Sequence, residues 1–264
     1  MLGSVKGGPT QTDFTPDNSY FFAPSLTVKP DLDTTFTILA SAWKNDTRVQ
    51  GFLPYVGTVV NAPFGRIPTS LFASDPSVDF FRREQAMVGY QFEKNVTDDF
   101  TFRQNARIAH DDVRFQTLLG NGYAGAPANA LLSRFNDYAR DIATQVNLDN
   151  QFEYRFGTGP VLHKALVGVD LKNYKVGDLQ AFDFNTPPLN LLNPVYGVPQ
   201  GFPGTVFANQ EITQKQVGVY AQDQMKLGRF TLVLSGRNDW VNTFNENLLA
   251  PSQGRDDSQF SGRA

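Results

Sequence analysis

The sequence contains no cysteine, only two histidines, and no apolar run of about 18 residues or more. The missing cysteine excludes a disulfide framework, a thiolate nucleophile and cysteine metal sites. His110 and His163 lie on separate predicted strands, and we interpret both as structural. The missing apolar run excludes a transmembrane helix. It does not test a transmembrane barrel, whose alternating strands average to a polar value.

Catalytic motifs are missing as well. The sequence has no G-x-S-x-G elbow, Walker loop, H-E-x-x-H pair or Rossmann glycine pattern. Aspartate pairs at 98–99, 111–112 and 256–257 have no partner cluster, so we interpret them as solvated. The net charge of -3 gives no reason to expect a nucleic-acid partner. We therefore expect neither an enzyme nor a cofactor.

The sequence does show strict alternation of apolar and polar residues, as in "RDIATQVNLDNQFEYRF" at 140–156. Ile142, Val146 and Phe152 stand at even positions, whereas Asp149 and Glu153 stand at odd ones. In an extended chain these two sets point to opposite faces, one apolar and one polar. The pattern recurs and predicts an antiparallel all-β fold of eight or nine strands. The predicted strands cover about 18–29, 34–46, 85–94, 100–115, 140–156, 161–176, 215–227 and 230–243, with a ninth starting at "DSQFSGRA".

The connections between these strands alternate between tight and long. The tight ones are 30–33, 95–99, 157–160 and 228–229, and the long ones are 47–84, 116–139, 177–214 and 244–257. Antiparallel neighbours put successive connections at opposite ends of a sheet. One trimmed end and one end with long loops are typical of an outer-membrane barrel, with short periplasmic turns and long extracellular loops.

Polar side chains such as Arg103, Arg107 and Arg237 on the second face suit a wide, wet lumen. Trp43 and Trp240, near the loop ends, would then stand at a membrane interface, as would five phenylalanines near the short turns. These five are Phe92, Phe100, Phe102, Phe156 and Phe230.

Three polar residues, Asn150, Asn238 and Asp223, fall on the apolar face. A bulge, or protrusion above the bilayer, would explain them. Two other fold classes remain as alternatives. One is a passive porin or a small self-closing eight-stranded barrel that acts as a pore or adhesin, and the other is a soluble β-sandwich that binds glycans.

Several segments resemble ferric-siderophore receptors of the TonB-dependent family, in the order and spacing of the ferrichrome-type branch. They include "FAPSLTVKPDLDTTFTILA", "GRIPTSLF", "TFRQNARIAH", "TGPVLHKALVGVDL", "QVGVYAQDQMKLGRFTLVLSGRNDW" and "DDSQFSGRA". The resemblance runs from about residue 18 to residue 264.

The resemblance implies a bacterial outer-membrane transporter with a 22-stranded barrel and an N-terminal plug. Residues 1–264 resemble part of the barrel domain alone, without the plug, the TonB box or the terminal strands. The N-terminus also lacks the pattern of a signal peptide, so we expect a fragment of a longer receptor. The implied partners are a ferric siderophore, outer-membrane lipid and the TonB–ExbB–ExbD system acting through a plug.

The resemblance also implies a ligand site made of aromatic side chains at the outer mouth. Phe52 in "QGFLP" matches one of these aromatics, and Phe182 in "LQAFDF" matches another, in the third long loop. Gln50, Leu119 and Asn121 depart from the pattern, which leaves room for a hydroxamate or mixed siderophore other than ferrichrome. Because such a chelate saturates its own iron, we expect aromatic faces and a few polar groups rather than protein metal ligands.

Overall fold

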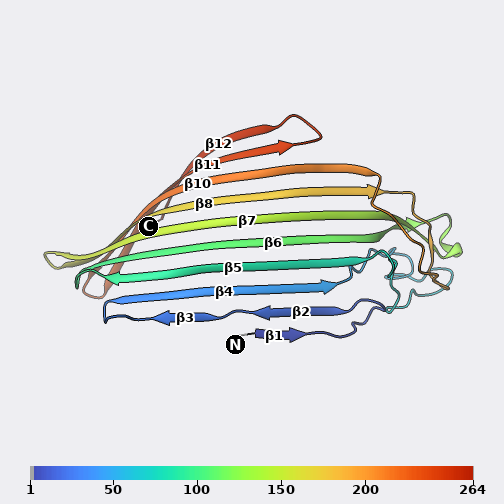
Figure 1. The fold of residues 1–264 in the computed structure, drawn as a ribbon, viewed down its shortest axis with the longest axis horizontal. Helices are drawn as coiled ribbons and strands as arrows, with labels where there is room; N and C mark the ends of the chain where they lie inside the picture. Colours follow the sequence, from blue (N-terminus) through green and yellow to red (C-terminus); the bar gives the residue numbers. More distant parts are fainter. Residues whose placement is uncertain (1–2, 264) are drawn as a thin grey trace.

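The structure is a computed structural model, and it describes residues 3–263. Within this range twelve strands form one antiparallel sheet, joined by turns, loops and the 3-10 helix η1 (Pro127–Asn129). Figure 1 shows the strands side by side in a single curved layer, with the long connections gathered at one end. No helix among these residues is long and apolar enough to cross a membrane.

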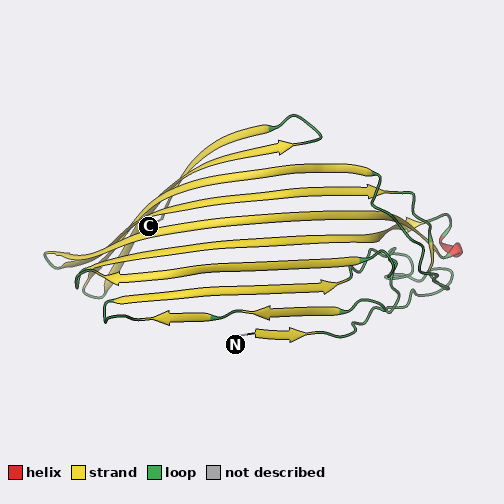
Figure 2. Ribbon diagram, in the orientation of Figure 1, coloured by secondary structure: helices red, strands yellow, loops and turns green. Residues whose placement is uncertain are grey.

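The strands are β1 (Gly3–Lys6), β2 (Asp17–Phe22), β3 (Ser25–Val28), β4 (Thr34–Thr47), β5 (Phe80–Asn95), β6 (Phe100–Tyr123), β7 (Leu131–Thr158), β8 (Val161–Asp183), β9 (Leu189–Asn190), β10 (Thr205–Leu227), β11 (Phe230–Asn247) and β12 (Gln253–Arg263). The main path follows the chain order, while β3 pairs with β4 and β9 pairs with β7. Figure 2 shows that strand makes up nearly all of the regular structure.

The sheet is open, and it is the only layer within residues 3–263. The short strand β1 lies at one edge and β12 at the other, and the two do not pair with each other. Both edges of the sheet are therefore unpaired within the described residues. A self-closing eight-stranded barrel and a two-layer sandwich are both wrong for this part of the chain.

The structure corrects the predicted number and length of the strands. There are twelve rather than eight or nine, and the predicted strand 18–29 divides into β2 and β3 beside Pro24, which has no N–H for the ladder. Strands β6, β7, β8 and β10 continue well into the predicted loops. The connections at the loop end are therefore 48–79, 124–130, 184–204 and 248–252. The last of these is short, so the predicted alternation of short and long connections fails there.

The two faces of the sheet are confirmed by the register. One row of cross-strand partners contains Ala106, Leu148, Leu171, Val217 and Trp240. The adjacent row contains Asn105, Asp149, Asp170, Gly218 and Asp239. We call the sides that carry these rows the apolar face and the polar face. Leu171 is 38% exposed and Trp240 is 49% exposed, so no protein layer covers the apolar face.

Aromatic rings form a nearly continuous row on the apolar face close to the short turns. Centroid distances are 5.5 Å for Phe36–Tyr90, 6.1 Å for Phe92–Phe102 and 5.1 Å for Phe102–Phe152. Trp240 shares this face, but Trp43 does not. Trp43 pairs with Gln85 on the polar face and donates its indole N–H to the Ser19 hydroxyl at 2.8 Å. The prediction that Trp43 stands at a membrane interface is therefore wrong.

The polar residues on the apolar face are paired with each other. The Tyr90 hydroxyl donates to Gln104 Oε1 at 2.6 Å, and Gln104 Nε2 donates to Asn150 Oδ1 at 2.7 Å. His163 Nδ1 lies 2.7 Å from an oxygen of Asp223. The register runs without a shift through these positions, so a bulge does not explain them. Hydrogen bonds between neighbouring side chains pair these residues instead, although the second carboxylate oxygen of Asp223 has no partner among the described residues.

We predict that Gln104→Leu destabilises the protein by about 1 kcal/mol, because it leaves Tyr90 and Asn150 without their shared partner on an apolar surface. The free energy of unfolding of the triple variant Tyr90→Phe, Gln104→Leu, Asn150→Leu should lie within about 0.5 kcal/mol of the wild-type value, because no polar group is then left without a partner. Urea-dependent unfolding in lipid vesicles measures the stability of both variants. A triple variant less stable than the single variant would contradict this account.

Candidate functional site

The connections 48–79, 124–130 and 184–204 pack together into what we call the loop cap. Its apolar core contains Ile67, Leu71, Ala73, Ala130, Leu132, Leu189 and Leu191. Leu53, Phe64, Tyr123 and Tyr196 pack against this core. Figure 1 shows these connections together beyond the ends of β5 to β8. The long loops are therefore a packed structure with its own buried interior.

Asp75 is the central polar group of the loop cap, and it is fully buried. Its Oδ1 accepts hydrogen bonds from the Ser77 amide at 2.9 Å and the Ser77 hydroxyl at 2.7 Å. Its Oδ2 accepts from the amides of Gly197 at 2.8 Å and Val198 at 3.1 Å. Burial raises the pKa of this carboxyl, but the bonds from Ser77, Val198 and Gly197 outweigh it and hold the pKa below its usual range. Asp75 is therefore ionised at neutral pH.

Arg134, near the start of β7, is a cation buried against the loop cap and is only 2% exposed. Its Nη1 donates to the carbonyl oxygens of Ala73 at 3.3 Å and Ser74 at 3.0 Å. Its Nε and Nη2 donate to the carbonyl oxygen of Pro187 at 3.2 Å and 3.0 Å. Every one of these partners is a backbone group, so Arg134 recognises the path of the two loops rather than their side chains.

A second buried carboxyl lies where the cap meets the sheet. Asp79 accepts from the Val49 amide at 3.1 Å and from the Thr117 hydroxyl. Burial raises the pKa of Asp79 above its ordinary value, although bonds from Thr117, Ser74 and Val49 oppose the shift.

Phe52, predicted to contact the ligand, lies on the surface of the loop cap with 68% of its area exposed. Its backbone is held closely against the sheet: a β-carbon at Gly120 would collide with the Phe52 carbonyl oxygen. The segment "QGFLP" and residues 119–121, where Leu119 and Asn121 depart from the family pattern, are therefore neighbours. An exposed ring on a fixed backbone suits a contact with an organic ligand.

Phe182, the second predicted residue, does not lie in a loop. It belongs to the last residues of β8, opposite Asp137 on β7 and Thr205 on β10. Its ring contacts Phe184 at 5.3 Å and Phe207 at 5.5 Å between centroids. The loop prediction failed because β8 extends far past the stretch whose alternation marks it as a strand. No aromatic ring contact joins Phe182 to Phe52 within the described residues.

The other aromatic residues of the long connections divide into two groups. Phe72 is buried in the cap, and Tyr123 and Tyr196 donate their hydroxyls to backbone carbonyls. By contrast, Tyr55 and Phe202 are more than half exposed, like Phe52. Sequence reasoning missed Asp75 and Arg134, because a single charged residue in a loop carries no signal of burial.

The polar face below the cap contains a hollow of about 830 Å³. Its lining includes Asn105, Asn147, Asp149, Leu166, Tyr220 and Arg237. Arg237 Nη2 donates to Asp170 at 2.9 Å and Asp239 at 2.6 Å, and the Tyr220 hydroxyl donates to Asp149 at 2.7 Å. Within residues 3–263, no three His, Asp or Glu side chains gather closely enough to hold a metal ion.

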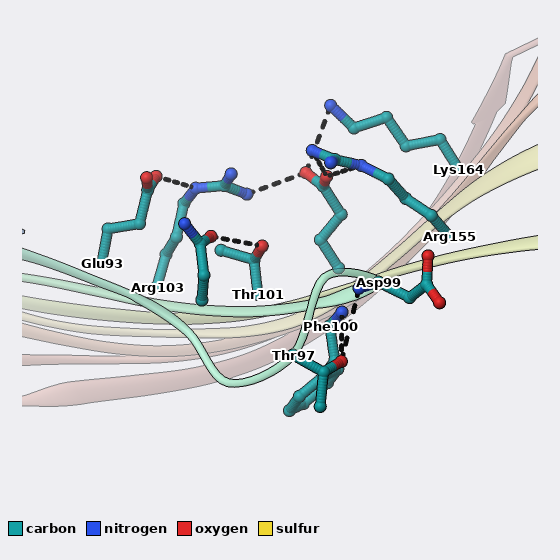
Figure 3. Close-up of polar contacts among 10 residues, drawn as sticks. Glu93, Thr97, Asp99, Phe100, Thr101, Arg103, Arg155 and Lys164 are labelled. Atoms are coloured by element: carbon teal, nitrogen blue, oxygen red, sulfur yellow. Dashed lines mark hydrogen bonds and ion pairs between the residues drawn. The ribbon is translucent and has the colours of Figure 1, made fainter. Parts of the chain in front are cut away.

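A charged cluster lies on the polar face near the short turns (Figure 3). Glu153 is 3% exposed. Its carboxylate oxygens form ion pairs with nitrogen atoms of Arg103 at 2.9 Å, Arg155 at 2.9 Å and Lys164 at 3.2 Å. Arg103 also donates to Glu93 at 2.6 Å. The carboxylate of Glu153 thus joins three cations from β6, β7 and β8, which ties adjacent strands together on the face turned away from the apolar side.

Comparison with known proteins identifies this arrangement. Residues 19–264 match the family model described as TonB dependent receptor-like, beta-barrel. The chain belongs to this family. It is 32% identical to the ferrichrome outer membrane transporter/phage receptor of Escherichia coli K12, across 100% of the chain and 38% of that protein. It is 30% identical to the ferrioxamine B receptor of Salmonella typhimurium, across 92% of the chain and 34% of that receptor.

Solved structures show the same fold. The ferric-catecholate import receptor Fiu from Escherichia coli, in its closed form, aligns with a TM-score of 0.81 at 16% identity, over 99% of this chain and 42% of that one. The siderophore receptor PiuA from Acinetobacter baumannii aligns with a TM-score of 0.78 at 16% identity, over 98% and 41%.

The family and its outer-membrane members place the chain in the bacterial outer membrane. The resemblance seen in the sequence is confirmed. The apolar face is therefore the lipid face, and the polar face lines the lumen. The chain spans about two fifths or less of the length of these relatives.

We predict that Gly120→Ala displaces the segment around Phe52, because the added methyl group would overlap the Phe52 carbonyl oxygen. Cleavage by an added protease within 48–79 should become several-fold faster in intact cells, while the barrel stays folded. Gly177→Ala is the matched control, since its β-carbon would meet nothing within 4 Å. Equal cleavage of the two variants would contradict the close contact.

Replacement of Glu153 by Gln should destabilise the barrel by roughly 2 kcal/mol, because three cations lose their shared partner while keeping partial access to water. The readout is the midpoint of thermal unfolding in detergent. Asp99→Asn serves as the control, because the Asp99 carboxylate points away from the cluster (Figure 3). If the two variants unfold at the same temperature, Glu153 does not hold the strands.

Proposed function

We propose that this chain serves in the uptake of ferric siderophores across the outer membrane, with hydroxamate chelates as the cargo. The observation that carries the proposal is the packed loop cap, which presents exposed aromatic rings above a polar lumen wall. Phe52, Tyr55 and Phe202 supply such rings at the cap. The relatives of this chain include receptors named for ferrichrome and ferrioxamine B, both of which are hydroxamate chelates.

The chemistry of the cargo supports this choice of site. A ferric hydroxamate brings six oxygen donors to its own iron, so the protein has only to recognise a compact organic surface. Aromatic rings bind such surfaces through large apolar contacts, and a few polar groups set the orientation. Phe52 and Phe182 remain our proposed ligand contacts, with Phe52 at the cap surface and Phe182 at the loop end of β8.

Transport through a lumen of this kind requires a gate and a source of energy. We propose that residues 1–264, as part of a barrel domain, work with a plug and with the TonB–ExbB–ExbD system of the inner membrane. In this proposal the protein binds and gates its cargo and makes no covalent bond, so it is not an enzyme.

Uptake of iron-55 complexes of ferrioxamine B and ferrichrome by iron-limited cells tests the proposal. Uptake of at least one complex should be lost when either this chain or TonB is deleted. A passive porin would instead give uptake that is insensitive to the loss of TonB. Uptake that persists without this chain would refute the proposal.

Within that assay, Phe52→Ala should weaken binding of the transported chelate to energy-depleted cells roughly tenfold, since an aromatic contact at an organic ligand is lost. Val96→Ala, exposed on a short turn at the opposite end of the sheet, is the control. Equal binding of the chelate by both variants would show that Phe52 does not contact the ligand.

A further inference from the structure

Two loops that are far apart in the sequence are joined in the cap through backbone atoms. Asp75 belongs to 48–79, and its amide donors Gly197 and Val198 belong to 184–204. Oδ1 accepts from Ser77 in its own turn and from the Gly197 amide at 3.1 Å, and Oδ2 accepts from the Gly197 and Val198 amides of the other loop. One buried side chain therefore couples local loop shape to the position of a second loop.

Arg134 ties the same two loops from the side of the sheet. It binds carbonyl oxygens of Ala73 and Ser74 in the first loop and of Pro187 in the second. Asp75 accepts from backbone N–H groups and Arg134 donates to backbone carbonyl groups, so the two side chains hold the same pair of loops through different peptide units. A backbone conformation that moved either loop would leave a buried charge without partners, which is costly.

The contacts of Asp75 and Arg134 also extend toward the exposed aromatic residue Phe52. Gly51 lies against Ala73, where a β-carbon on Gly51 would be 3.7 Å from the Ala73 methyl group. Arg134 holds the carbonyl of Ala73, and Phe52 follows directly after Gly51. The position of the Phe52 backbone is thus set by the segment that Asp75 and Arg134 fix.

We infer that Asp75 and Arg134 are positioning residues that join loops 48–79 and 184–204 into one rigid body, so that the aromatic mouth is formed before a ligand arrives. The effect on ligand binding rests on the proposed function, whereas the coupling of the two loops does not. Preformed loops leave less ordering to be done on binding, so the same contacts give a tighter complex.

Spin labels on the two loops test the coupling directly. The chain has no cysteine, so Val59→Cys and Val195→Cys create the only two labelling positions in it. Both residues are exposed, at 62% and 68%, one on each loop. Double electron–electron resonance on the protein in outer membranes should give one narrow distance distribution for this labelled parent.

Two substitutions should broaden that distribution at least twofold. Asp75→Ala removes the acceptor for both loops, and Arg134→Lys replaces a fork that spans two loops by a single ammonium group. Ser77→Ala is the matched control, because it removes the local hydroxyl donor and leaves the bonds from Gly197 and Val198 in place. It should keep the narrow distribution. Unfolding at the parent's temperature in detergent shows that each barrel is intact.

The outcomes separate the inference from the proposed function. A broad distribution in the labelled parent, or an unchanged one in both Asp75→Ala and Arg134→Lys, overturns the coupling. If the loops are coupled and ferrioxamine B is bound, the same two variants should raise its dissociation constant about tenfold. An unchanged constant overturns the positioning role. Coupled loops in a protein that binds neither ferrioxamine B nor ferrichrome overturn the proposed function and leave the coupling standing.

Discussion

Pairing of backbone hydrogen bonds within the sheet is the constraint on which this structure depends. Hydrocarbon offers no partner for an N–H or C=O group, so a segment that crosses it must satisfy its backbone internally. Continuous ladders such as β7 with β8, which run from Asn136 to Thr158 on one side, meet this demand. Side chains are then forced to alternate between lipid and lumen, and that alternation produces the two faces and the two different ends.

Polar residues on the wrong face show how far this constraint reaches. Gln104 and Asn150 face lipid, yet each finds its partner on a neighbouring strand at the same level. Glu153 on the lumen wall is a nearly buried charge, and cations from three strands neutralise it. In both places a side-chain bond crosses the same strand boundary as the backbone ladder and reinforces it.

The fold was predictable where the chain crosses the membrane and unpredictable where it leaves it. Strand β4 was expected at 34–46 and is found at Thr34–Thr47, because lipid on one side and water on the other impose strict alternation. Phe182 was assigned to a loop because the predicted strand ended at residue 176, whereas β8 runs to Asp183. Asp75 and Arg134 were missed for a different reason: their burial arises from contacts between loops more than 50 residues apart.

The length of the strands sets where recognition takes place. Strand β7 has 28 residues, which at about 3.3 Å per residue and a tilt of about 40° gives a wall roughly 70 Å tall. Only about 25 Å of that height is needed for the lipid band. The cap thus stands several Debye lengths above the charged head groups, given a screening length of about 8 Å in physiological salt. Lipid charge is screened out at that height, so any preference for an anionic or a neutral chelate must come from the protein's own rim.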